Sequence, residues 1–211
     1  MSMSLESMAI EMPAVFGHPN RIAFRGVLTV VDAVSDKAPA GARGHRVMLT
    51  RAAAEAAIPS LLGMGLDYSP RLDGHDTRRK IGVITRAEIV GREITVRGFL
   101  YGRDFPEMVE EIGKNRAVGE RARKVGDPAA QSASRNGHTR HADTSVRATR
   151  HYAGGSPAST PAGLGMSYEI ADAMVEDIKA TVWVLNRVTF TGAAVLRRDK
   201  AAYKSTWIEL G

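Results

Sequence analysis

The sequence predicts an α+β domain or a β-barrel with a few helices on its outside, interrupted by a long disordered insertion. Roughly eight short runs rich in β-branched and aliphatic residues are typical of strands, and two or three segments carry helix signals. Large apolar side chains almost vanish from residues 114–163. We therefore expect one domain from residues 21–113 and 164–205, with a loose segment at 1–20 and a tail at 206–211.

The first half of the chain supplies most of the expected strands and both expected helices. The strand-like runs are residues 22–34, 45–49, 66–68, 80–84, 87–90 and 93–100. Thr50 can cap a helix over residues 51–62, whose alanines favour helix and whose end is marked by Pro59. A second helix is predicted at 106–112, with Pro106 in its first turn.

The segment 114–163 is basic as well as polar. Between Lys114 and His151 there are nine Lys or Arg residues and three acidic ones, so the segment accounts for the whole net charge of +6. Such residues can contact phosphates, but no interleaved aromatic residues accompany them, so only nonspecific contact with nucleic acid is expected. Three histidines in the segment lack an ordered third ligand and do not indicate a metal site, namely His138, His141 and His151.

The organised chain resumes at Leu164. Strands are expected at residues 166–170, 178–186 and 188–196, with Trp183 as the large anchor of the second. A turn of helix is expected at 199–203.

Several classes of protein are excluded or disfavoured. The chain has no cysteine, which rules out disulfides, thiolate catalysis and cysteine-bound zinc. No run approaches eighteen apolar residues, and the N-terminus has neither a basic start nor a long apolar stretch, so neither a membrane span nor a signal peptide is expected. No motif indicates a cofactor.

Without cysteine, a nucleophile must be Ser or Thr, and it needs a base. Ser167 lies inside an expected strand, where a hydroxyl bonded to backbone is the simpler interpretation. His75 lies in a polar turn before a buried strand, where a solvated side chain is the simpler interpretation. His45 opens a strand and is expected to be structural, and His18 lies in the loose N-terminal segment.

An acid that orients the histidine is harder to choose. Glu169 shares a strand face with Ser167 by the two-residue period, so it is either a supporting acid or a surface carboxylate.

Several motifs occur in a fixed order along the chain. They are Gly74-His75-Asp76, Ile81-Gly82-Val83-Ile84, residues 91–100, residues 105–112, Leu164-Gly165-Met166-Ser167-Tyr168 and residues 183–203. This series resembles the phage prohead proteases of capsid maturation, over roughly residues 22–113 and 164–205. That family is similar in fold to the herpesvirus assemblins, which implies a mostly antiparallel barrel ringed by helices.

The resemblance implies a serine endopeptidase, with Ser167 as nucleophile and His75 as general base, acting through a tetrahedral intermediate held by backbone N–H donors. It implies scaffold segments, coat-protein extensions and the protease itself as substrates, inside a procapsid in the host cytoplasm, and self-association into a homo-oligomer. Two features depart from the family. Arg187 stands where relatives often have an acid two positions before a late-strand Ser or Thr, here Thr189, and the insertion is long. Glu169 and Asp76 are the two acids that could take the place of the missing one.

Two alternatives remain at this point. The first is a catalytically impaired, protease-like scaffold or capsid-interacting protein, which Arg187 and the insertion favour. The second is a nucleic-acid-binding protein that uses the basic segment at 114–163.

Overall fold

The computed structural model describes residues 7–13, 15–114 and 163–211. Nine strands in these ranges form one mixed sheet. The strands are β1 (Ser7–Ala9), β2 (Arg21–Val30), β3 (Arg46–Leu49), β4 (Gly65–Tyr68), β5 (Lys80–Val90), β6 (Glu93–Tyr101), β7 (Leu164–Val175), β8 (Val182–Arg197) and β9 (Trp207–Leu210). The expected strand-dominated α+β fold is confirmed.

The sheet is organised around β8, its longest strand. One edge of β8 pairs with β7, and the other edge pairs in parallel with β3 at one end and with β4 at the other. From β4 the sheet continues through β5, β6, β2 and β9, and all of these pairs are antiparallel. The β4–β8–β7 region therefore brings β4 beside β7 and β8, which come much later in the chain.

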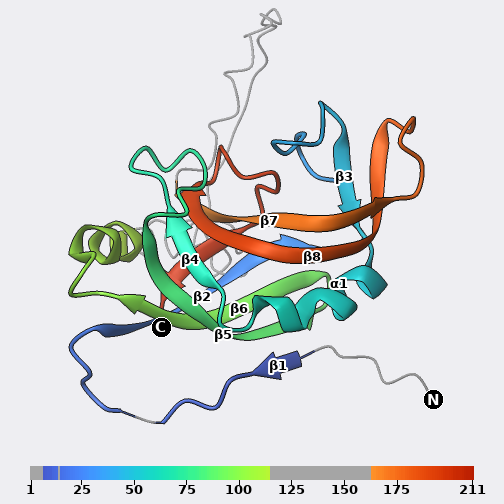
Figure 1. The fold of residues 1–211 in the computed structure, drawn as a ribbon. Coiled ribbons are helices and arrows are strands. Elements are labelled where there is room, and N and C mark those ends of the chain that lie inside the picture. The colour runs from blue at the N-terminus through green and yellow to red at the C-terminus, as the bar shows by residue number, and fades with distance from the viewer. Residues whose placement is uncertain (1–6, 14, 115–162) are drawn as a thin grey trace, which may run out of the picture.

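The sheet curls into a half-barrel, so that β7 approaches the β2–β9 end (Figure 1). Gly26 of β2 faces Met166 of β7 so closely that a Cβ at Gly26 would lie 2.7 Å from the Met166 sulfur. The backbone N–H of Met166 donates to Thr206 Oγ1 at 3.2 Å, directly before β9 begins. The buried apolar side chains of β7 and of the β2–β9 end of the sheet pack in the space between them.

Two α-helices and one 3-10 helix occur among the described residues. Helix α1 (Arg51–Ala57) begins at Thr50, whose side-chain oxygen accepts the backbone N–H of Ala53. The predicted helix over 51–62 ends early as an α-helix and continues as the 3-10 helix η1 (Ile58–Leu61), because Pro59 has no N–H to donate. The second helix covers 106–114 within the described residues and matches the one predicted at 106–112.

Several predicted boundaries are wrong. The expected tail at 206–211 contains β9, which pairs with β2, and the N-terminal segment at 1–20 contains β1, which pairs with β5. The runs at 178–186 and 188–196 belong largely to one strand, β8, because the polar pair Asn186 and Arg187 is exposed within the strand instead of breaking it. The runs at 80–84 and 87–90 likewise form one strand, β5. The turn of helix at 199–203 is absent, since turns and bends occupy these residues. The insertion, apart from residues 114 and 163, lies outside the described residues.

Candidate active site

Pairing across three strands positions the candidate residues. Ser167 of β7 lies opposite Ala194 of β8, and Ala194 lies opposite Asp67 of β4. Side chains of directly opposed residues point to the same face of a sheet, and neighbouring strands are about 4.8 Å apart. Ser167 and Asp67 therefore face the same side at a separation of about two strand spacings, with only a methyl group between them.

His75 lies across this gap. Its Nε2 is 3.4 Å from Ser167 Oγ, and its Nδ1 is 3.3 Å from Asp67 Oδ1. The first distance is a long hydrogen bond, as is common for catalytic pairs without substrate. The second is an ion-pair distance whose geometry falls short of a well-formed hydrogen bond. The side chain of His75 is 14% exposed, so the imidazole is shielded but open on one side.

The loop that carries His75 is held in place by its own side chains. Ser69 Oγ donates to Asp73 Oδ1 at 2.7 Å, and the Asp73 N–H donates back to Ser69 Oγ at 3.1 Å. The Arg197 N–H donates to the Leu72 carbonyl at 2.7 Å, which ties the loop to the end of β8. These bonds fix the chain on the approach to His75.

Asp67 is fully buried and its carboxylate has three partners. Lys80 Nζ donates to Oδ2 at 2.9 Å, the Asp76 N–H donates to Oδ1 at 3.3 Å, and His75 lies on the same oxygen. Burial alone would raise the pKa of Asp67, but His75 and Lys80 together outweigh it and hold that pKa below its usual value. The carboxylate is thus kept ionised beside the imidazole.

The sequence did not single out Asp67, although it carries a signal. Asp67 lies between two apolar residues, Leu66 and Tyr68, in a short strand. A carboxylate buried in such a run is costly unless it is paired. That pattern indicates a partner, but only the pairing of β4 with β8 reveals which one.

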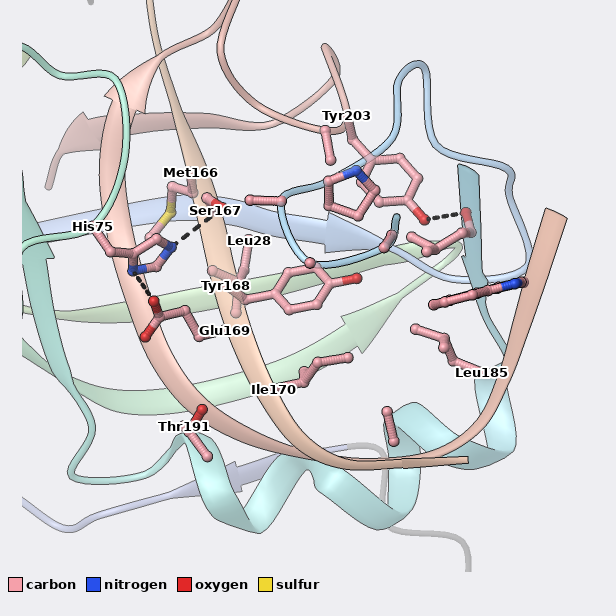
Figure 2. Close-up of a pocket in the computed structure, with 18 of the residues that line it drawn as sticks. Leu28, His75, Met166, Ser167, Tyr168, Glu169, Ile170, Leu185, Thr191 and Tyr203 are labelled. Carbon is pink, nitrogen blue, oxygen red and sulfur yellow. Dashed lines mark hydrogen bonds and ion pairs between the residues drawn. The ribbon is translucent and has the colours of Figure 1, made fainter. Parts of the chain in front are cut away.

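The two acids chosen from the sequence lie differently. Glu169 Oε1 is 4.0 Å from His75 Nδ1, and its side chain is 45% exposed, so it is a second and looser carboxylate at the same ring nitrogen (Figure 2). The Asp76 carboxylate points away to Arg78 and Arg79, and only its backbone N–H reaches the site.

Small residues clear room for these side chains. A Cβ at Gly192, the partner of Glu169 across β7 and β8, would lie 2.7 Å from Glu169 Oε2. A Cβ at Gly65 would lie 2.9 Å from the Lys80 stem. The side chains of Glu169 and Lys80 therefore each lie over a glycine. The His75 ring spans the gap between Ser167 and Asp67, where the residue between them is Ala194.

The remaining residues considered in the sequence lie apart from the site. Arg187 pairs with Met174, seven residues along β8 from Ala194 and thus roughly 23 Å away at the strand rise. Arg187, which stands where the family often has an acid, therefore does not contact His75. His45 stacks on Trp183 at 4.6 Å, and its Nδ1 is 2.9 Å from the Ala180 carbonyl, an arrangement that matches the expected structural role. His18 Nδ1 accepts the Asn20 N–H.

His138, His141 and His151 lie outside the described residues. Within the described ranges, no three His, Asp or Glu side chains gather as a metal site would require, and no helix is long and apolar enough to cross a membrane.

Searches for relatives supply no further guide. No family model, no curated protein and no solved structure matches this chain. The function must therefore be argued from the geometry of the site.

Proposed function

We propose that this chain is a serine endopeptidase of the phage prohead protease type. One observation carries the proposal: His75 lies within reach of Ser167 on one side and the buried carboxylate of Asp67 on the other. A hydroxyl, an imidazole and a carboxylate in this order form the arrangement that activates a serine for acyl transfer.

The three residues have distinct roles in the proposed reaction. As Ser167 Oγ bonds to the scissile carbonyl carbon, its proton passes to His75 Nε2. Asp67, kept ionised by its surroundings, stabilises the imidazolium that results. His75 then gives this proton to the leaving amine as the C–N bond breaks. Water, activated by the same imidazole, hydrolyses the acyl-enzyme.

The capsid setting rests on the order and spacing of the sequence motifs. The resemblance supplies scaffold segments and coat-protein extensions as substrates, a homo-oligomeric state, and action inside a procapsid in the host cytoplasm. It also implies an assemblin-like barrel, which is closed further than the half-barrel of the described residues. The curled half-barrel of the described residues is compatible with that framework.

Fluorophosphonate labelling tests the proposal. The wild-type chain is expected to be labelled at Ser167, and Ser167→Ala and His75→Ala are expected to lose labelling. Asp67→Asn should slow labelling by about 10³–10⁴-fold, by analogy with loss of the acid in other serine hydrolases. Asp76→Asn is the matched control, because the Asp76 carboxylate points away from His75.

Co-expression with the neighbouring capsid genes tests the physiological role. Processing of a capsid or scaffold protein should occur with wild type and stop with Ser167→Ala. Identical processing by both, together with an unlabelled Ser167, would leave the non-enzymatic scaffold as the function.

A further inference from the structure

The cavity that contains His75 and Ser167 extends well beyond them. Its volume is about 550 Å³, within the usual range for ligand pockets and larger than the two catalytic side chains require. It follows β7 from Ser167 toward Val175, and its other walls come from the 39–42 loop, β3 and the start of β8 (Figure 2). The space beyond the hydroxyl is therefore part of the same opening.

The walls change in character with distance from Ser167. The one imidazole and the one carboxylate group of the lining, His75 and Glu169, stand at the end near Ser167. The remainder is mainly apolar, and its main members are Leu28, Val47, Ile170, Val175, Trp183 and Leu185. Tyr168 and Tyr203 also line it, and burial raises the pKa of both phenols, that of Tyr168 to about 12, so they are neutral.

These walls are held rigidly. Trp183 stacks on His45, and its Nε1 donates to the Ile178 carbonyl at 3.1 Å. Tyr168 packs edge-on against the buried Phe190 at 5.4 Å, and the Tyr203 hydroxyl donates to the Ala33 carbonyl at 3.1 Å. A preformed apolar cavity loses little side-chain entropy when a ligand enters.

We infer that this cavity is a specificity site that receives one large apolar side chain of the substrate, aromatic or branched aliphatic, close to the bond that is cleaved. The inference rests on the proposed function, since the ligand is the substrate of Ser167. Ile170 is three residues along β7 from Ser167, about 10 Å at the strand rise, so a residue near the scissile carbonyl can reach it. An acidic side chain is rejected, because it would leave water for apolar walls and pass the Glu169 carboxylate.

Cleavage of peptide mixtures tests this inference. The probe is a set of internally quenched peptides randomised on both sides of the cleaved bond, with products sequenced by mass spectrometry. At one position, Phe, Leu or Ile should exceed Ala by about 10- to 100-fold in kcat/KM, as expected for filling an apolar pocket. Peptides with Glu at that position should be cleaved more slowly than peptides with Ala there.

Two exposed alanines on β7 provide matched variants. Ala173 lines the cavity, whereas Ala171 lies two residues away on the same strand and outside the lining. Ala173→Phe adds an aromatic ring to the cavity and should reduce the Phe-over-Ala ratio to within about threefold, since the ring covers apolar wall area that the substrate side chain would otherwise bury. Ala171→Phe should keep the wild-type ratio. Because a ratio is measured, any loss of active protein cancels.

The possible outcomes distinguish failure of the specificity site from failure of the proposed peptidase function. Peptide cleavage without a preference for large apolar residues, or with a preference that Ala173→Phe leaves intact, overturns the specificity site alone. Absence of both peptide cleavage and fluorophosphonate labelling overturns the proposed peptidase and the specificity site together.

Discussion

The carboxylate of Asp67 has the Lys80 ammonium group on one oxygen and the His75 imidazole on the other, and the charge balance of the site depends on it. Its side chain is fully buried, with Lys80 on one oxygen and His75 on the other. Breaking a buried pair usually costs more than the pair contributes, because the remaining charge is left in a poor environment. Asp67 is therefore expected to stabilise the fold as well as to orient the histidine.

Acid should remove the stability that Asp67 provides. Its pKa is lowered in the folded protein, so its contribution is complete above the unfolded value of about 3.9 and is lost as pH falls through the lower folded value. The free energy of unfolding of the wild type should thus decline below about pH 4, and Asp67→Asn should lack that part of the decline. At neutral pH, Asp67→Asn should be roughly 1–3 kcal/mol less stable.

Urea denaturation at a series of pH values measures both effects. Glu169→Gln is the matched control, because it neutralises a half-exposed carboxylate of the same site that has one ion-pair contact, at 4.0 Å. A neutral-pH stability of Asp67→Asn equal to that of the wild type would contradict the structural role.

At the scale of elements, β8 provides the floor of the site through its small residues. Gly192 and Ala194 face the site, where Gly192 lies opposite Glu169 and Ala194 separates Ser167 from Asp67. The sequence could predict most of the strands and the helix starts, since local signals fix them, but it missed β1 and β9. Nor could it predict that Ala194 lies between Ser167 and Asp67, because this depends on the pairing of β4 with β8, which lie more than a hundred residues apart in the chain.

Ala194→Val should displace His75 and leave the sheet intact. The added methyl groups project toward the ring that bridges Ser167 and Asp67, and a misplacement of about 1 Å at a catalytic group can cost about 10²-fold in rate. The measurement is kcat/KM for peptide cleavage, together with thermal melting.

Ala193→Val is the matched control for Ala194→Val. Ala193 is equally buried but points to the opposite face, toward the core. Both variants should lose similar stability, about 1–3 kcal/mol from overpacking. Equal activity losses in the two variants would show that overpacking, and not the position of His75, causes the effect.

At the scale of the whole molecule, the curl of the sheet decides where Ser167 lies. The last strand, β9, pairs with β2, and Thr206 just before it joins β7 through the Met166 N–H. The sequence interpretation placed residues 206–211 in a tail, because four strand residues at a chain end carry too little pattern to indicate a partner. The closure that positions Ser167 therefore comes from long-range contacts.

Thr206→Val should loosen this closure. Thr206 is 1% exposed, and its hydroxyl accepts from the Met166 N–H and donates to the Tyr203 carbonyl at 2.9 Å. Valine keeps the shape but leaves a buried N–H and a carbonyl without these partners, which costs roughly 1–3 kcal/mol for such a group. Because Met166 adjoins Ser167, kcat/KM should fall along with stability.

Thr206→Ser retains the hydroxyl and should preserve more of the activity than Thr206→Val, although it deletes a methyl group. The serine variant could instead be the less active of the two in peptide cleavage. That result would show that packing of the methyl group, and not the hydrogen bond to the Met166 N–H, holds β7 in place.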